Sequence, residues 1–305
     1  MLVTIEIVVP FALALWLLLA FPRDRLSAIS LTIAFALIVT ALLLTGIWTV
    51  TPWWWPWFCA AIGAIGAMRG LNKAARCWPR GWGWAATAVA LPMAALGGWL
   101  TAEGLAGRRI SGPAIDLAFP LSPGNYIVAN GGTNLAVSSH AETLDLGVPR
   151  HRLWNGQSYG VDIVALNVVG RTSGGLAPTD FERYAIYGRR VVAPCAGQVV
   201  AAVDGLADSP IPLTGDEPSA GNHVMLRCGP AIILLAHFRL GTVKVRVGQS
   251  VTVGQPVAEV GNSGSSSEPH LHIHAQLPGT VAAPFSGRPL PIRISGRNPV
   301  RNARF

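Results

Sequence analysis

The sequence has 305 residues and a formal net charge of +8, from 23 Lys and Arg against 15 Asp and Glu. Apolar residues make up 51% of the chain and charged residues only 12%, and the mean hydropathy of +0.43 argues against a protein that is soluble throughout. The basic residues of the C-terminal tail are spaced apart and belong to no recognisable motif, so they predict a solvated surface and no nucleic-acid partner.

Four apolar runs follow one another in the first third of the chain, at residues 2–21, 26–48, 52–68 and 82–100. Each is near the ~20 residues that a helix needs to cross ~30 Å of hydrocarbon. Buried helices of a soluble core are the alternative, but four such runs in succession favour an all-α transmembrane bundle of four helices at residues 1–106. The third run is the weakest candidate, because its tryptophan cluster at 53–57 is typical of the membrane interface.

Basic residues in the short connections predict the orientation of this bundle. They are Arg23 and Arg25 after the first run, and Arg69, Lys73, Arg76 and Arg80 between the last two. Such residues are typical of cytoplasmic loops, so everything after about residue 104 is expected outside the cytoplasm. The first run lacks the basic start of a secretory signal, which predicts a retained multi-pass anchor in the lipid bilayer. Whether the helices also contact a membrane partner is left open.

The pattern changes after a segment rich in Gly, Arg and Pro at residues 107–124, which is expected to be a linker. From residue 125 to 305, short β-type segments alternate with turn residues at intervals of roughly ten residues, as in antiparallel hairpins. The expected strands are 159–165, 190–192, 198–203, 223–227, 231–237, 243–247, 256–260 and 270–276. The sequence therefore predicts a second domain that is mostly β, built on antiparallel sheet.

Cys195 and Cys228 are the only cysteines in this second half. An oxidising compartment favours pairing of two cysteines that fold within reach, so we expect a disulfide between them. Two buried free thiols are the alternative.

Alternating histidines give the sharpest chemical signal. All seven histidines lie after residue 106, and His270, His272 and His274 alternate with aliphatic residues. On a strand the three imidazoles face one side. Because neutral imidazole is a good zinc ligand, this pattern favours a metal or catalytic site over a solvated strand face.

Two further residues gain meaning in combination with these histidines. His237 ends an apolar strand, where a packed or capping role is the alternative. Asp162 is the single acid in a segment suited to burial, and a buried carboxylate needs a cation, a metal or several hydrogen-bond donors. Both are therefore candidates for the same site.

In chain order these elements resemble the M23 family of zinc metallopeptidases of the LytM type. The family's motifs have counterparts at 159–162, 193–199, 221–224, 236–238 and 269–272, and the resemblance runs from about Tyr126 to Gln276. The turns at 247–257 also resemble lipoyl and biotinyl carrier domains, but the lysine that such carriers need at a hairpin tip is absent here. The resemblance implies a LytM-like fold.

The resemblance also implies roles for individual residues. Asp162 and His272 are expected to bind Zn²⁺, while His237 and His270 are expected to orient the attacking water or stabilise the oxyanion. His274 and His223 are candidates for supporting a ligand, and His274 is not expected to bind the metal itself.

One position departs from the family pattern. Ser158 stands four residues before Asp162, where the family has its first zinc-binding histidine, and a hydroxyl is a poor zinc ligand near neutral pH. Another histidine is expected to replace it. His140, which follows a Gly-Gly pair in a polar loop as in some divergent relatives, ranks first, followed by His223 and His151.

The resemblance implies a zinc endopeptidase that cleaves peptide bonds of peptidoglycan on the outer face of the bacterial inner membrane. The alternative is a LytM-like module that binds cell-wall peptide or regulates another hydrolase without catalysis of its own. The retention of Asp162, His237, His270 and His272 favours the enzyme.

Overall fold

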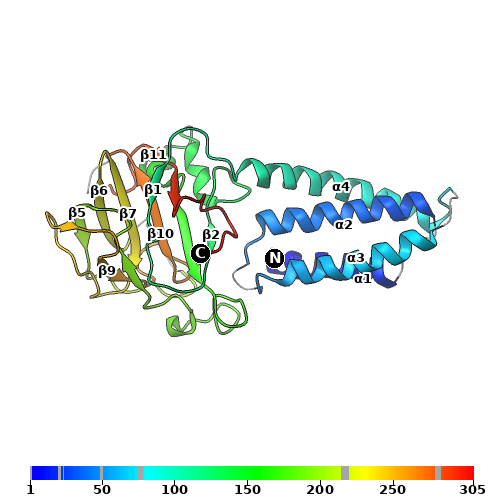
Figure 1. The fold of residues 1–305 in the computed structure, drawn as a ribbon, viewed down its shortest axis with the longest axis horizontal. Coiled ribbons are helices and arrows are strands. Elements are labelled where there is room, and N and C mark those ends of the chain that lie inside the picture. Colours follow the sequence, from blue (N-terminus) through cyan, green and yellow to red (C-terminus); the bar gives the residue numbers. More distant parts are fainter. Residues whose placement is uncertain are drawn as a thin grey trace. The chain divides into compact units, whose positions relative to one another are not determined.

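A computed structural model describes residues 2–19, 22, 24–48, 51–74, 78–213, 220–278 and 283–305. It divides the chain into two compact units, Met1–Ala106 and Gly107–Phe305 (Figure 1). Arg23 and Arg76, which entered the orientation argument, lie outside the described residues.

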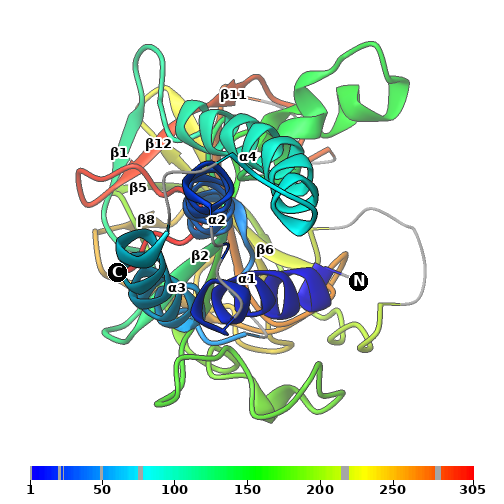
Figure 2. The same ribbon diagram turned by 90° about the vertical axis from the view of Figure 1, so that its right-hand side faces the viewer.

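The described part of the first unit contains four helices, as predicted from the four apolar runs. They are α1 (Leu2–Leu19), α2 (Arg25–Thr45), α3 (Trp55–Lys73) and α4 (Trp82–Ala106). Within this unit α2 packs mainly on α4, and α1 on α3 (Figure 2). Gly97 of α4 permits the close approach, because a Cβ at this position would lie 2.9 Å from the backbone nitrogen of Ile38 in α2.

Helix ends in this unit follow local capping rules. The carboxylate of Asp24 precedes α2 and accepts hydrogen bonds from the backbone N–H and the hydroxyl of Ser27, at 2.8 and 2.6 Å. Pro56 lies in the first turn of α3, where a missing N–H costs nothing. The starts of α2 and α3 therefore follow signals in the local sequence.

Among the described residues, two helices, α2 and α4, are long and apolar enough to cross a membrane. The part of α1 that was assessed, Glu6–Leu19, is shorter than a span requires, and α3 carries Arg69, Asn72 and Lys73 in its last turns. Length and composition thus support two of the four predicted spans.

The second unit is built on an eight-stranded sheet with strand order β2-β3-β10-β7-β6-β5-β8, and β11 pairs with β10. All its pairings are antiparallel, which confirms the predicted mostly-β domain of antiparallel sheet. Its strands are β2 (Tyr126–Asn130), β3 (Val161–Ala165), β5 (Gly197–Val203), β6 (Asn222–Cys228), β7 (Ala231–Phe238), β8 (Ser250–Val251), β10 (Leu271–Gln276) and β11 (Pro289–Leu290).

Two small sheets accompany the large one: β4 (Arg190–Val192) pairs with β9 (Pro256–Glu259), and β1 (Ile115–Leu117) pairs in parallel with β12 (Ile292–Ile294). Strand β1 lies in the segment expected to be a linker, and Leu117 and Leu121 of that segment are buried in the core. Residues 107–124 are therefore folded into the second unit. The expected strand at 243–247 forms no ladder and is a loop.

Short 3₁₀ helices connect β2 to β3: η1 (Ser139–Leu144), η2 (Pro149–Leu153) and η3 (Asn155–Gln157). A further one, η4 (Phe181–Arg183), precedes β4. Cys195, just before β5, and Cys228, at the end of β6, are joined by a disulfide. The connection between β2 and β3 matters most for the site, because it carries His140.

Alternation along β10 separates the core from the site. Leu271, Ile273 and Ala275 are fully buried in the main hydrophobic core. The residues between them, His272 and His274, therefore face the other side of the sheet. The alternation of aliphatic residues and histidines in the sequence therefore corresponds to the two faces of β10.

Candidate metal centre

Strand register places the first two groups of the site. Asp162 of β3 and His272 of β10 are direct cross-strand partners, and Ala236 of β7 is the partner of His272 on its other side. His237 follows Ala236 with a positive φ of 67°, which is uncommon for a residue other than glycine. Such backbone strain is typical of functional sites.

Asp162 is the centre of the cluster. Its Oδ1 lies 2.9 Å from Nδ1 of His272 and 3.5 Å from Nε2 of His270, and its Oδ2 lies 2.9 Å from Nε2 of His140. The Asn130 side chain also donates to Oδ2, at 3.0 Å. Asp162 is 6% exposed, so its carboxylate depends on these neighbours, and not on water, for hydrogen bonds.

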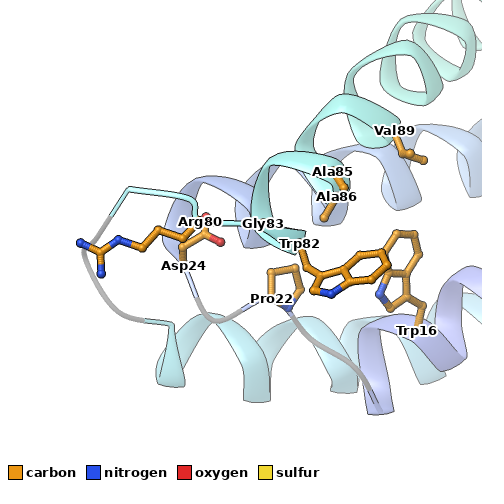
Figure 3. A pocket seen from close by; sticks show the side chains of 10 residues that line it. Trp16, Pro22, Asp24, Arg80, Trp82, Gly83, Ala85, Ala86 and Val89 are labelled. Atoms are coloured by element: carbon orange, nitrogen blue, oxygen red, sulfur yellow. The ribbon is translucent and has the colours of Figure 1, made fainter.

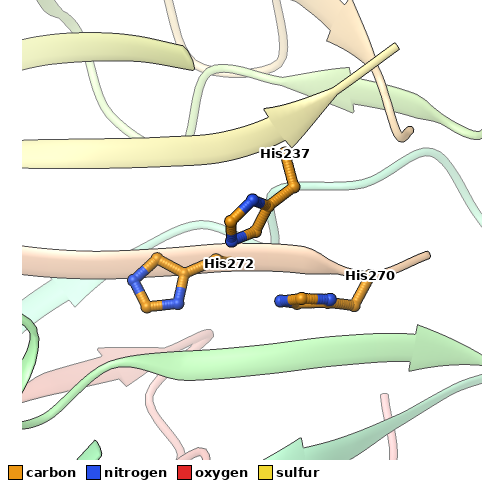
Figure 4. A group of neighbouring side chains, drawn as sticks. All are labelled: His237, His270 and His272. Atoms are coloured by element: carbon orange, nitrogen blue, oxygen red, sulfur yellow. The ribbon is translucent and has the colours of Figure 1, made fainter. Parts of the chain in front are cut away.

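His237 and His270 are oriented by backbone carbonyls. Nδ1 of His237 lies 2.8 Å from the carbonyl oxygen of Ser263, and Nδ1 of His270 lies 2.8 Å from that of Glu268. A carbonyl only accepts hydrogen bonds, so each neutral ring carries its proton on Nδ1 and has a lone pair on Nε2. Figure 4 shows these two rings and His272 converging from β7 and from the start of β10.

His274 contacts His272 on the side away from Asp162. Its Nδ1 lies 3.0 Å from Nε2 of His272. Among the described residues, its Nε2 is buried without a hydrogen-bond partner, and the same holds for Nε2 of His223. His274 therefore lies beside the cluster and contacts it through His272.

The other two histidines ranked as replacements for the missing ligand lie elsewhere. Nδ1 of His223 contacts the carbonyl of Gly221 at 2.8 Å, and Nδ1 of His151 contacts that of Asp145 at 3.0 Å. Neither belongs to a group of converging ligand atoms among the described residues. Of the three ranked histidines, the fold brings His140 to Asp162.

The groups that can hold a metal form two overlapping sets. His140, Asp162 and His272 have one ligand atom each within 4.8 Å of one another, and so do His237, His270 and His272. The first set combines two imidazoles with a carboxylate, and three protein ligands with an open fourth position are typical of catalytic zinc. The chemistry of this donor set fits zinc.

Electrostatics distinguish the members of the cluster. Burial alone would raise the pKa of Asp162, but the charges of His140 and His270 and hydrogen bonds from His140 and His272 hold this pKa well below its usual range. Conversely, burial opposes protonation of His140, but the Asp162 carboxylate raises the His140 pKa above its usual value. Burial lowers the pKa of His272 to about 4 and that of His237 well below its usual range. His237 and His272 are therefore neutral near pH 7.

The cluster opens into a cleft of about 260 Å³. Besides the five central groups, its lining includes Trp154 and Phe285, whose rings stack with centroids 5.6 Å apart. Gln157 also lines the cleft, whereas the neighbouring Ser158 does not. The cleft thus joins an aromatic wall to a cluster of imidazoles.

The first unit has a cavity of its own, of about 840 Å³, with Trp16, Trp82, Asp24 and Arg80 among its lining residues (Figure 3). Asp24 is committed to capping α2, and most of the remaining lining is apolar side chain or backbone. No converging ligand set among the described residues lies there. The histidine cluster is therefore the candidate site.

Sequence reasoning did not identify every residue that touches this cluster. Asn130 contacts Asp162, and the aromatic wall of Trp154 and Phe285 lies in segments without a motif. A polar residue that ends a buried strand was the available signal for Asn130. The two aromatic residues gave no such signal.

Comparison with known proteins gives one family. Peptidase family M23 matches residues 180–284. The matched segment includes β7 and β10 with their histidines, and it begins after Asp162 and His140.

Similar solved structures include a zinc-containing peptidase from Vibrio cholerae, with 24% identity over 30% of this chain and 24% of that chain, and a TM-score of 0.24. A putative M23 peptidase from Pseudomonas aeruginosa is 20% identical over 62% and 60% of the two chains, with a TM-score of 0.28. The antimicrobial peptidase lysostaphin from Staphylococcus simulans is 21% identical over 34% and 41%, with a TM-score of 0.24. This chain thus covers less than two thirds of each of these structures. By the family match, residues 180–284 form a domain of peptidase family M23.

Proposed function

We propose that the second unit is a zinc-dependent endopeptidase, with His140, Asp162 and His272 as metal ligands. The observation that carries this proposal is the convergence of His140 and His272 on opposite oxygens of Asp162, each at 2.9 Å. Asp162 and His272 come from hydrogen-bonded strands, and strands hold ligand directions more firmly than loops do.

The contact between His272 and His274 supports the choice of ligand atom. Nε2 of His272 faces Nδ1 of His274, so Nδ1 of His272 is the atom that faces Asp162. A neutral His272 that binds metal through Nδ1 carries its proton on Nε2 and donates it to His274. His274 would thus fix both the tautomer and the ring orientation of His272, as partners of metal-bound histidines commonly do.

Two imidazoles are available for proton transfer. In their neutral forms both His237 and His270 have a lone pair on Nε2, because a backbone carbonyl accepts the Nδ1 proton of each ring. A bound zinc supplies a water of lowered pKa, near ~7, and polarises the scissile carbonyl. We assign to His237 and His270 the roles of accepting a proton at Nε2 and returning it to the leaving amine. Peptide hydrolysis is the reaction that these groups can perform together.

His140 would replace the histidine that the family has at the position of Ser158. The hydroxyl of Ser158 contacts Thr143 at 2.8 Å and the carbonyl of Asn155 at 2.6 Å. The Ser158 side chain is therefore engaged away from the cleft, whereas His140 lines it.

We propose peptidoglycan peptide as the substrate and the outer face of the bacterial inner membrane as the location. The M23 family match and the cleft beside Trp154 and Phe285 support a peptide substrate. The basic residues near the ends of the helices support an orientation in which the second unit lies outside the cytoplasm. We further propose that α1 and α3 cross the membrane together with α2 and α4.

Protease accessibility tests this orientation. An extracytoplasmic second unit would be digested when protease is added to spheroplasts, and protection of that unit would contradict the orientation.

Zinc content tests the proposed function. The full chain, purified in detergent, should contain about one zinc per molecule by elemental analysis. His140→Ala and His272→Ala should each abolish this content and the release of new amino groups from purified wall peptides. A chain that takes up no zinc even after incubation with the metal would contradict the proposal and favour a module that binds or regulates without catalysis. Full zinc content in His140→Ala but none in His237→Ala would instead assign the metal to the second histidine set.

A further inference from the structure

His140 is the one proposed ligand that no strand holds. It lies on the 3₁₀ helix η1, in the connection between β2 and β3. Strand pairing fixes Asp162 opposite His272, but it does not fix the position of η1, which lies outside the sheet. A metal ligand must be held to within about 0.5 Å of its working position. Side-chain contacts must therefore fix η1.

Arg301 lies in the C-terminal segment, residues 295–305, and contacts one side of the connection between β2 and β3. Its side chain is buried, with the residue 6% exposed. It donates from Nε to the carbonyl of Ala129 at 3.0 Å, from Nη1 to the carbonyl of Ala136 at 3.2 Å, and from Nη2 to Oδ1 of Asn130 at 2.7 Å. One guanidinium thus ties the end of β2 to the residues just before His140.

The Arg301 contact fixes which way the Asn130 amide points. A guanidinium has no acceptor, so the atom of Asn130 that faces it must be the oxygen. The NH₂ group then faces Asp162 and donates to its Oδ2 at 3.0 Å. The same Asn130 oxygen also accepts from the backbone N–H of Ser139, at 3.4 Å. Asn130 therefore links one proposed ligand, Asp162, to the residue that precedes another.

Thr143 holds the other side of η1. Its hydroxyl donates to the carbonyl of His140 at 2.8 Å and lies 2.8 Å from the hydroxyl of Ser158. Thr143 and Ser158 are both buried, at 2% and 0% exposure. Ser158 occupies the sequence position of the family's first histidine, and here it anchors the helix that carries His140.

We propose that Arg301, Asn130, Thr143 and Ser158 form a clamp that positions His140 as a metal ligand, so that the C-terminal segment is an integral part of the metal centre. This inference rests on the proposed zinc function. The four side chains are positioning residues. Asn130 and Thr143 contact a proposed ligand directly, and Arg301 and Ser158 act through these two residues. Loss of such partners typically weakens metal binding by about 10–100-fold.

The test compares zinc affinities of the full chain in detergent, measured by competition with a chromophoric chelator. Arg301→Met and Thr143→Val should each weaken zinc binding by about 10–100-fold, and Arg301→Lys, which keeps fewer donors, should lie between Arg301→Met and the unmodified chain. The matched control is Arg304→Met, in the same C-terminal segment as Arg301. It removes an exposed hydrogen bond of 3.0 Å from Arg304 to the side chain of Asn125. This control should bind zinc within about twofold of the unmodified chain.

A thermodynamic cycle separates positioning from general destabilisation. A chain that carries His140→Ala should not retain zinc through purification, so its weak residual affinity is measured by titration with excess zinc. In this background Thr143→Val should cost no further zinc affinity, because its effect passes through His140. The inference is overturned if the clamp variants bind zinc as tightly as the unmodified chain, if Arg304→Met is weakened equally, or if Thr143→Val costs the same with and without His140. Failure of the unmodified chain to bind zinc would overturn the proposed function itself, and the clamp with it.

Discussion

The two sides of the proposed metal centre are built in different ways. On the strand side, Asp162 and His272 face each other because β3 and β10 are hydrogen-bonded in that register. On the loop side, His140 depends on side-chain hydrogen bonds, including one between Arg301 and Asn130, which are 171 residues apart. The strand side is robust because backbone pairing serves both ligands at once. The loop side depends less on backbone pairing, so the ligand can come from a different sequence position, such as His140 in place of position 158, if side chains hold it.

Asp162→Asn tests the point where the two sides meet, and should have the largest effect. It keeps the shape of the side chain but removes the charge that His140 and His272 both contact. We expect zinc affinity to fall by more than the ~10–100-fold typical of supporting residues, with loss of peptide hydrolysis. Calorimetric titration with zinc measures this directly. Retention of near-normal affinity would show that the metal binds the set of His237, His270 and His272.

Ser158→His in a chain that carries His140→Ala asks whether a ligand can be returned to the family's position. We expect no recovery of zinc binding, because the buried Ser158 side chain points to Thr143 and Asn155 and not into the cleft. Overpacking there should also lower stability by roughly 1–3 kcal/mol. Elemental analysis and thermal unfolding give the two readouts. Recovery of one zinc per chain would mean that the two sides are interchangeable.

His274→Ala probes the support of the strand side. It removes the partner of Nε2 in His272, at 3.0 Å, and should weaken zinc binding by about 10–100-fold. The matched comparison is His223→Ala, which removes another buried histidine with an unpartnered Nε2 among the described residues. Chelator competition should separate these two variants. Equal affinities would exclude the assigned role of His274.

Lower pH should weaken metal binding gradually, and mainly through the loop side. Zinc and a proton compete for Nε2 of His140, and the Asp162 carboxylate raises the pKa of His140 despite its burial. His272, with a pKa of about 4, is already neutral above pH 5. Zinc affinity should therefore rise with pH and fall by about tenfold per unit below the pKa of His140, with one proton released on binding. Calorimetry in buffers of different ionisation enthalpy counts the proton, at a pH below the pKa of His140 and well below the ~7 of zinc-bound water. Release of two protons in this range would contradict the assignment.

Much of the fold followed from local patterns. The apolar runs predicted four helices, and β-type segments between turn residues predicted β5, β6, β7 and β10 to within about one residue at each end. Strands β1, β2, β8, β11 and β12 were not predicted. The reason for β1 is physical: three residues, Ile115–Leu117, become a strand only because β12 lies beside them. The turn-rich composition of residues 107–124 could not reveal that contact.

The sequence by itself determined the strand side of the candidate site. Alternating histidines at 270, 272 and 274 required a common face once β10 formed, and a lone acid in a buried strand required partners. Only the tertiary structure decided which histidine meets Asp162 from outside the sheet. His140, His151 and His223 have equal imidazoles, and the choice among them depends on how the connection between β2 and β3 folds and on the buried Arg301. Local periodicity specifies faces of strands, whereas the position of a loop ligand is set by contacts between segments far apart in the chain.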